Sequence, residues 1–570
     1  MYQKFENALL NVLHSSSKKK MILLATLVAF ILSVAMIPTE LVMAKMLPGK
    51  NNDTYSVYVD LPTGSSIEQT RRVTECVTGI LQKESQAIDM EVFLGMGSPL
   101  DFAGLIKGSH FKNSENVAEV VVNLTKKHDR SEPSYLMVQR LRPVIQKQCQ
   151  SIIAQTNIKF VEPPAGPPTM AAVVAEIYGD NASGIRHLSE RVKDVFSHTK
   201  GLVDIDIMQD DIYDKFEVHV NSDKISRAGL NIKHVNDILY LAFEGMDIAV
   251  KNSREVSEQI PIFLVLDPVG KKFSSKDLNA VEMKLMSLKL MNNMGMMVPI
   301  TEVVSVVPVK SNPMIVSKNL HEMTNVVAET DMVSQVYPLM DARNEILNTF
   351  GNEYEITKIG LFNLELIDKK SHEQYKLLWD GEMEVTLDTF VDLGGAFIAA
   401  LILIFLLMVI YYKSFVLSGI VLLGSFLSII GVLVGHFIMN IFTADTFFLT
   451  ATSLIGFIAL IGISSRNSLL LIDFTKSLMS DKGMPKKEAI AYAAATRAKP
   501  IFLTAAAIIL ASTLLASDAV FGGLGVALIF GTIAAVVTSL IVVPILLDNS
   551  DLERHFNFHE RKAVSVMDPL

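Results

Sequence analysis

The stretch Leu393–Ile410 reads LGGAFIAALILIFLLMVI, eighteen consecutive residues without an ionisable side chain. A helix crosses the hydrocarbon core of a bilayer with about 20 mostly apolar residues, so this stretch and its neighbours are long enough for one span. Five further runs have the same character: Met21–Pro38, Phe415–Ile438, Phe447–Ile472, Ile501–Ser517 and Ala519–Leu547. Any one run alone is compatible with a buried helix of a soluble domain, but six together predict a polytopic α-helical membrane protein with six transmembrane helices.

Charge is distributed unevenly along the 570 residues, of which 50% are hydrophobic and 19% charged. Residues 391–548 hold only 15 of the 111 charged residues. A chain this apolar is not disordered, and its net charge of −9 argues against nucleic-acid binding. A single soluble core stops growing near about 250–300 residues, so the chain must hold more than one domain.

Lysine and arginine gather on one side of the predicted spans. Lys18–Lys20 precede the first span, Lys413 follows the second, and six more lie between Thr475 and Lys499. The short loops at Ala444–Asp445 and at Asp518 carry none. Because cytoplasmic loops are enriched in Lys and Arg, we expect both termini in the cytoplasm and the long segment 44–390 outside. A signal peptide is the alternative for the first run, but no small-residue cleavage site follows it.

Segment 44–390 alternates strands and helices. The order strand–helix–strand is predicted three times, over Tyr55–Leu61, Ile67–Gln86 and Met90–Leu94; Val117–Leu124, Ser134–Ala154 and Ile158–Val161; and Ala172–Tyr178, Ile185–His198 and Val203–Met208. Repeats of this length predict a large α+β domain built of βαβ (ferredoxin-like) modules. Pro163–Pro168 has the composition of a linker. A helix-bearing insertion at Asp223–Gly245 precedes predicted strands at Ile260–Leu266 and Met297–Val309.

Two sulfur-containing sets stand out in this outside segment. Six methionines lie within 15 residues: Met283, Met286, Met291, Met294, Met296 and Met297. Thioethers are soft ligands that suit Cu(I), but no Cys or His lies nearby, so adaptable apolar packing is the favoured interpretation. Cys76 and Cys149 fall on predicted helices of neighbouring modules. A disulfide is one alternative, but the sequence does not establish the spacing that it needs, so we expect two buried thiols.

Arg466 interrupts the apolar run Phe447–Ile472, and an ionisable group inside a span costs about 2.5–3.5 kcal/mol on insertion scales. Such residues line pathways, form relays or pair with another charge, although a long side chain can also reach the interface by snorkelling. Asn467 is a polar neighbour, which favours an interior face. Each Asp near a span lies at or beyond its end, so we expect the carboxylate partner of Arg466 on another polypeptide. Thr504 either joins this polar cluster or bonds back to its own helix.

Several short stretches have the composition of known motifs: Lys45–Pro48, Val59–Gly64, Lys318–His321, Trp379–Glu382, Gly456–Ser468, Asp473–Phe474 and Arg497–Thr504. Together they resemble the second half of a resistance-nodulation-division (RND) efflux permease of the hydrophobe/amphiphile type. The resemblance covers essentially the whole chain. It implies that Arg466 takes the place of a basic residue that pairs with intramembrane Asp residues of the first half, with Thr504 and Asn467 as further proton-relay or ion-pair candidates. Arg stays protonated, so it responds to proton uptake by losing its ion pair.

The resemblance also implies partners and a location. We expect a bacterial inner-membrane protein that needs a complementary N-terminal half to supply the Asp residues, in a trimer with a periplasmic adaptor and an outer-membrane channel. We expect no cofactor and no metal. The predicted segments are a cytoplasmic N-terminal segment 1–20, spans at 21–43, 391–412, 415–439, 447–473, 500–517 and 519–547, a periplasmic domain 44–390, a cytoplasmic amphipathic segment 475–499 and a cytoplasmic tail 548–570.

Two other functions share this plan. SecD-like protein-export accessories have six spans too, but they place a carboxylate in the fourth span, where this chain has Arg466. A non-transporting membrane assembly subunit would bind a partner through the outside domain without moving a solute. An enzyme has little support, because the sequence contains no Walker A, His-Glu-x-x-His or Gly-x-Ser-x-Gly motif.

Overall fold

The computed structural model describes residues 2–49, 51–99, 102–109, 112–163, 166, 169–257, 259–266, 277–331, 333–443 and 446–552, and for residues 102 and 103 the backbone only. The predicted loop at 444–445, most of the proline-rich linker and the tail beyond residue 552 lie outside these residues. The chain divides into two compact units, one formed by Met1–Met208 with Val316–Leu570 and one by Gln209–Ile315.

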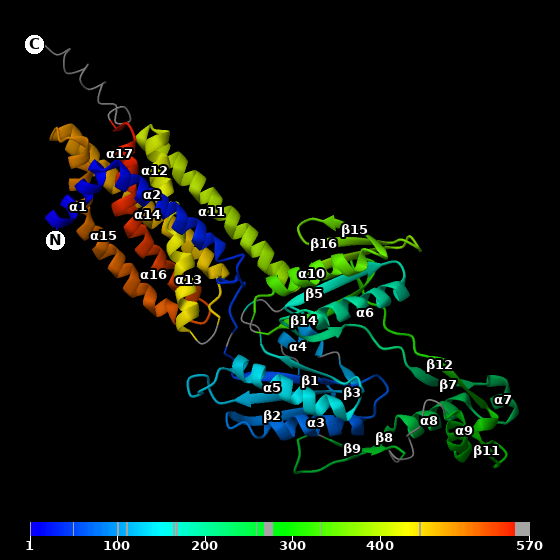
Figure 1. Cartoon of the computed structure of the whole chain (residues 1–570). Coiled ribbons are helices and arrows are strands. Elements are labelled where there is room, and N and C mark those ends of the chain that lie inside the picture. The colour runs from blue at the N-terminus through cyan, green and yellow to red at the C-terminus, as the bar shows by residue number, and fades with distance from the viewer. Residues whose placement is uncertain are drawn as a thin grey trace, which may run out of the picture. The chain divides into compact units, whose positions relative to one another are not determined.

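Five helical segments of the first unit are long and apolar enough to cross a membrane (Figure 1). They are α11 (Glu382–Tyr412), α12 with α13 (Phe415–Phe426 and Ile429–Phe442), α14 (Ala451–Asp481), α15 (Lys486–Ala516), and α16 (Gly522–Val537) with a π-helical turn (Thr538–Val542) and α17 (Val543–Asn549). The first predicted span corresponds to α2 (Ser16–Ala35), which carries Lys18–Lys20 in its first turns. The N-terminal segment before it forms α1 (Tyr2–His14), which contacts α15.

Several helix boundaries lie outside the predicted spans. Helix α11 begins at Glu382, nine residues before the predicted span, because Gly381 adopts φ +86° and the chain turns directly from a strand into the helix. The predicted amphipathic segment 475–499 contains the end of α14, which continues to Asp481, and the start of α15, which runs unbroken from Lys486 through Pro500. Apolar periodicity alone does not locate these ends, since a membrane helix continues into polar sequence until its chain reverses.

The interior of the bundle is closely packed around α16, which contacts α13, α14 and α15. Glycines permit this approach. A Cβ built on Gly431 would lie 2.2 Å from the carbonyl oxygen of Phe530, and one on Gly531 would lie 2.1 Å from Leu460. Small residues at helix contacts are typical of membrane bundles, where packing replaces the hydrophobic driving force of water.

The first soluble module, module A, is one four-stranded antiparallel sheet in the order β2-β3-β1-β4. Its elements are β1 (Thr54–Asp60), α3 (Ile67–Leu81), β2 (Ala87–Met96), α4 (Phe102–Lys107), β3 (Asn113–Leu124), α5 (Ser134–Cys149), a 3₁₀ turn (Gln150–Ile152) and β4 (Asn157–Val161). The first two predicted strand–helix–strand repeats therefore share a sheet and are not independent units. The alternation of buried and partly buried residues along β4 follows from packing one face of this sheet more closely than the other.

Cys76 on α3 and Cys149 at the end of α5 form a disulfide, with Cα atoms 5.7 Å apart. The expectation of two separate thiols is therefore wrong. The two helices belong to one module and contact each other, which brings positions 73 residues apart in sequence into bonding distance. A disulfide is typical of an oxidising compartment, which agrees with an outside location for module A.

The second module, module B, repeats this connectivity. Its sheet contains β6-β14-β5-β17 in that order, extended by β16 and β15 beyond β17, with β13 pairing the start of β14. The elements are β5 (Val173–Gly179), α6 (Ala182–His198), β6 (Leu202–Ile207), β13 (Ser317–Lys318), β14 (His321–Thr330), α10 (Val336–Phe350), β15 (Tyr354–Ile359), β16 (Asn363–Asp368) and β17 (Gln374–Asp380). Phe196 stacks on Trp379 in its core, with ring centroids 6.1 Å apart.

The second unit is inserted in sequence between β6 and β14. It contains β7 (Asp214–Val220), α7 (Ser222–Arg227), α8 (Ile232–Phe243), β8 (Met246–Lys251), β9 (Ile260–Leu264), α9 (Leu278–Ser287), β10 (Lys289–Met291), β11 (Met297–Pro299), a 3₁₀ turn (Ile300–Glu302) and β12 (Val304–Lys310). Its core includes Ile225, Val235, Val281, Leu285 and Ile300. The six clustered methionines are not part of this core, because each exposes 54–71% of its surface. The favoured interpretation, adaptable apolar packing, therefore does not hold for the core of this unit.

Candidate functional site

Arg466 lies on α14, a 31-residue helix that begins with a capping box. The Thr450 hydroxyl accepts a hydrogen bond from the backbone N–H of Ser453, and the Ser453 hydroxyl accepts one from the N–H of Thr450. Arg466 is the sixteenth residue of this helix, and the next charged residue, Asp473, follows about 10 Å further along the axis.

Arg466 belongs to an exposed stripe on α14 whose residues recur every three or four positions: Ile455, Ala459, Gly462, Arg466 and Leu470. This period places them on one face of the helix, the α14 face. The buried side of the helix carries Ser464, Ser465, Asn467 and Ser468. Arg466 thus faces outward from the chain's own bundle, whereas Asn467 lies inside it. An interior location for Arg466 requires a second bundle against this face.

The polar partners predicted for Arg466 lie elsewhere. Within the described part of the chain, no ion pair joins Arg466 to a carboxylate. Asp473 accepts a hydrogen bond from the Tyr411 hydroxyl at 3.0 Å. Thr504 is exposed on α15 and donates to the carbonyl oxygens of Pro500 and Ile501, 3.1 and 3.0 Å away. Its hydroxyl therefore has the back-bonding geometry, and the described contacts do not link it to Arg466.

A buried histidine in the bundle has a structural explanation. His436 Nδ1 lies 2.9 Å from the carbonyl oxygen of Val432, and Nε2 lies 2.9 Å from the Ser453 hydroxyl. A neutral imidazole that donates through one nitrogen and accepts through the other satisfies both contacts. The pair fastens α13 to the start of α14 and leaves no ring nitrogen for another role.

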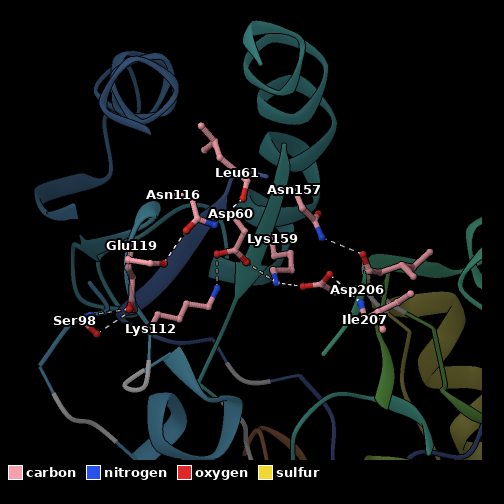
Figure 2. Close-up of polar contacts among 12 residues, drawn as sticks. Asp60, Leu61, Ser98, Lys112, Asn116, Glu119, Asn157, Lys159, Asp206 and Ile207 are labelled. Atoms are coloured by element: carbon pink, nitrogen blue, oxygen red, sulfur yellow. Dashed lines mark hydrogen bonds and ion pairs between the residues drawn. The ribbon is translucent and has the colours of Figure 1, made fainter. Parts of the chain in front are cut away.

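Charged side chains also gather where module A meets module B, in the charged junction (Figure 2). Lys112, before β3, and Lys159, on β4, point at Asp60 from either side, and Lys159 also reaches Asp206 on β6 of module B. The Lys159 ammonium lies 2.7 Å from Asp60 Oδ2. The Asn157 amide donates to the carbonyl oxygen of Ile205 at 3.2 Å. The junction is therefore a chain of alternating charges that joins the two modules.

The electrostatics of the junction keep its central pair ionised. Burial disfavours the charged form of Asp60, but Lys159 and Lys112 outweigh it and hold the pKa of Asp60 below its usual value. Burial likewise opposes the charge of Lys159, but Asp60 and Asp206 raise the pKa of that ammonium. For Lys112, burial prevails over the attraction of Asp60 and lowers the pKa.

A second row of polar contacts runs beside the first. The Arg142 guanidinium lies 3.1 Å from Asp204 and 3.2 Å from Asp331, both in module B. Asp204 also accepts hydrogen bonds from the Gln146 amide at 3.0 Å and from the backbone N–H of Phe160 at 3.2 Å. The modules are thus held together by hydrogen bonds and ion pairs, which have stricter geometry than apolar contacts.

A pocket of about 160 Å³ adjoins this row. Its lining includes Phe160 and Phe448, whose ring lies 5.6 Å from the Lys45 ammonium, together with Glu329, Glu382 and Arg142. Glu162, also in the lining, accepts a hydrogen bond from the Ser134 hydroxyl at 3.0 Å, but burial raises the pKa of its carboxyl to about 7. These residues span positions 45 to 448 with no local motif, so only the folded chain reveals the pocket.

The described residues include no group of three or more His, Cys, Asp or Glu side chains placed to hold a metal ion. The charged groups of the described residues include the charged junction, the pocket lining and Arg466 on the α14 face. The sequence indicated only the last of these, because a lone charge in an apolar run is visible without any knowledge of tertiary contacts.

The chain is similar to known membrane transporters in sequence and in fold. A family model described as the AcrB/AcrD/AcrF family matches residues 1–548. The swarming motility protein SwrC of Bacillus subtilis is 25% identical over 381 residues, which is 65% of this chain and 32% of SwrC. The multidrug resistance protein MdtC of Proteus mirabilis is 21% identical over 437 residues, 76% of this chain and 39% of MdtC. A crystal structure of a heavy metal efflux pump superposes with a TM-score of 0.71 at 18% identity, over 96% of this chain and 52% of the pump. The chain thus spans about a third to a half of the length of these relatives.

Proposed function

The chain belongs to the AcrB/AcrD/AcrF family of RND permeases, and we propose that it acts as the second half of a proton-driven permease that exports amphiphilic solutes or drugs. Members of this family are inner-membrane transporters, not enzymes, and work with an adaptor and an outer-membrane channel. In this proposal a complementary half, on a separate chain or on the same polypeptide, packs against the α14 face and supplies the missing carboxylates.

The observation that carries the proposal is the outward position of Arg466. A guanidinium facing lipid costs about 2.5–3.5 kcal/mol on insertion scales, and a carboxylate on a second bundle removes much of that penalty. Gly462, one turn earlier on the same face, has no heavy atom within 4 Å of a built Cβ. A small residue beside the charge allows a partner helix to approach closely.

The coupling step follows from the permanent charge of arginine. While the partner carboxylate is ionised, it holds Arg466 in an ion pair. When a proton neutralises that carboxylate, the pair is lost and the two bundles are free to shift. Thr504, exposed on α15, serves this step by hydrogen bonding to a partner carboxylate, whereas Asn467 lies inside the chain's own bundle and does not face the partner.

The proposal includes the topology. The first span is Met21–Pro38, which makes six with the five long segments, and both termini are cytoplasmic. Modules A and B are ferredoxin-like and periplasmic, and the complete permease is a trimer. Tryptic accessibility of the two termini in right-side-out and inverted vesicles checks the orientation, and cleavage of the N-terminus only in right-side-out vesicles contradicts it.

Efflux measurements test the role of Arg466. The chain is expressed with a half that carries an intramembrane Asp pair, in cells that lack their own pumps. We expect Arg466→Met to abolish efflux while the halves still co-purify, and Arg466→Lys to retain part of it because the cation remains. Drug sensitivity equal to wild type in Arg466→Met contradicts the ion-pair role.

The need for a complementary half has its own test. Gly462→Leu adds a large side chain to the α14 face without a clash inside the chain, so we expect normal folding but reduced co-purification. A matched control is Leu470→Ala, which alters the same face without adding bulk. Proton-dependent flux by the chain reconstituted without any second half refutes the proposal.

A further inference from the structure

The inserted unit carries an exposed methionine surface over residues 283–297. All six methionines of this segment are exposed, whereas its leucines point toward the core: Leu285 is fully buried, and Leu288 and Leu290 pack against the core partly buried. Apolar contact alone does not require methionines on the surface and leucines toward the core. The thioether is what methionine has and leucine lacks.

The strongest feature is a cross-strand pair of methionines. Met291 on β10 lies directly opposite Met297 on β11. Backbone bonds join Ile300 to Leu288 and Asn292 to Met296, at 3.0 and 2.9 Å. Since hydrogen-bonded and non-bonded pairs alternate in an antiparallel ladder, the methionine pair occupies a non-bonded position. Side chains at such positions are the closest in a sheet, with Cβ atoms about 4.5–5.5 Å apart.

The turn that joins the two strands is held in place by a buried amide. Asn292 Oδ1 accepts hydrogen bonds from the backbone N–H groups of Met294 and Met296, at 3.0 and 2.9 Å. Its Nδ2 donates to the carbonyl oxygen of Ala228 at 3.1 Å, which ties the hairpin to the end of α7. The turn methionines therefore project from a backbone that is already ordered.

We propose that this hairpin binds a soft monovalent cation, Cu(I), through the thioethers of Met291 and Met297, with a turn methionine as third ligand. Soft thioethers select Cu(I) over harder ions such as Zn²⁺ or Mg²⁺. Leu290, the residue before Met291, packs against the core, and successive side chains of a strand point to opposite faces. The methionine pair therefore lies on the solvent face, where an ion can enter. The site is independent of the α14 face and of transport.

Silver(I) is the probe, since it shares the ligand preference of Cu(I) and does not change oxidation state. The purified full chain, labelled with ¹³C at the methionine methyl groups, is titrated with Ag(I), and affinity is measured by calorimetry. We expect micromolar or tighter binding, with shifts of the Met291 and Met297 methyl signals. The double variant Met291→Leu/Met297→Leu should bind at least tenfold more weakly, since leucine keeps the volume and removes the sulfur.

The matched control is Met283→Leu/Met286→Leu on α9, which removes two equally exposed thioethers from the same surface. It should change the affinity by less than twofold. Equal binding by wild type and the Met291/Met297 variant refutes the site and leaves only adventitious binding to exposed methionines. Failure of wild-type protein to bind micromolar Ag(I) refutes it as well, and the surface is then an apolar docking face.

Discussion

Loss of the Cys76–Cys149 disulfide should destabilise module A by several kcal/mol. The bond closes a loop of 73 residues. In the chain-entropy model, such a cross-link removes about 15 cal/mol/K from the unfolded chain, which corresponds to about 4.4 kcal/mol at 25 °C. Stabilities of small domains are of the order of 5–15 kcal/mol, so the bond is a large part of the stability of module A.

Hydrogen exchange of the full chain measures this effect locally, because peptides from β1, β3 and α5 report on module A alone. Reduction of wild-type protein should raise exchange in these peptides and leave module B and the membrane helices unchanged. Reduction is the cleanest perturbation, since it alters no side-chain volume.

The matched variants are Cys76→Ala, Cys149→Ala and the double substitution. Each single change already removes the cross-link, so the double should cost little more than either single, apart from the small cavity left at the fully buried Cys149. Identical exchange of oxidised and reduced wild-type protein refutes the reasoning, and so does the detection of two free thiols in protein isolated from the cell.

Three further predictions concern charge and packing. The pKa of Glu162 is raised to about 7 in the folded chain, so the folded state binds one more proton than the unfolded state between about pH 4.5 and 7, and stability falls as the pH rises through that window. Glu162→Gln should remove this pH dependence of stability and stabilise the protein by about 3 kcal/mol at pH 8. Unfolding is followed by the fluorescence of the single tryptophan, and a variant with the pH dependence of wild type contradicts the assignment. Asp60→Asn should lower the free energy of unfolding by about 3–5 kcal/mol, measured by thermal unfolding, because Lys159 and Lys112 lose their shared carboxylate. Because the pKa of Asp60 is low in the folded chain, its stabilisation is complete at neutral pH and declines only as the pH falls below about 4. A variant as stable as wild type at pH 7 contradicts the role of the charged junction. Gly435→Val should reduce the yield of folded protein, since its Cβ would lie 2.6 Å from Phe530, whereas Gly462→Val, with an open surrounding, serves as the control that keeps the yield.

Much of the fold follows from local sequence patterns. The apolar runs predict the membrane helices because hydrophobic length is a local property, and the strand–helix alternation predicts the elements of modules A and B closely. The prediction for Tyr55–Leu61, for example, differs from β1 by one residue at each end. Pairing is not local, however. The sheet of module A joins β1 to β4, about 100 residues later, and nothing in either strand alone indicates its neighbour.

The errors have the same origin. Cys76 and Cys149 were separated in the prediction because two strand–helix–strand repeats were assigned to different modules, and one shared sheet makes them neighbours. The methionines at 283–297 follow the period of no single element, since they lie on a helix, two strands and a turn, so their common exposure was invisible. The charged junction was missed because Asp60, Lys159 and Asp206 are unremarkable residues until two modules meet.

The contrast between two sets of charges supports a partner for the α14 face. At the junction, ion pairs within the chain join Lys112 to Asp60 and Lys159 to Asp206, although each of these side chains is mostly buried. Arg466 lies in a less polar setting and forms no ion pair with a carboxylate among the described residues. Charged groups in the soluble modules, where water would have lowered the penalty, are thus paired more completely than the one in the apolar run, where the penalty is largest. Since even the charges of the junction are paired, we expect Arg466, whose burial in lipid costs more, to be paired as well. Its carboxylate is therefore expected on the surface that covers the α14 face.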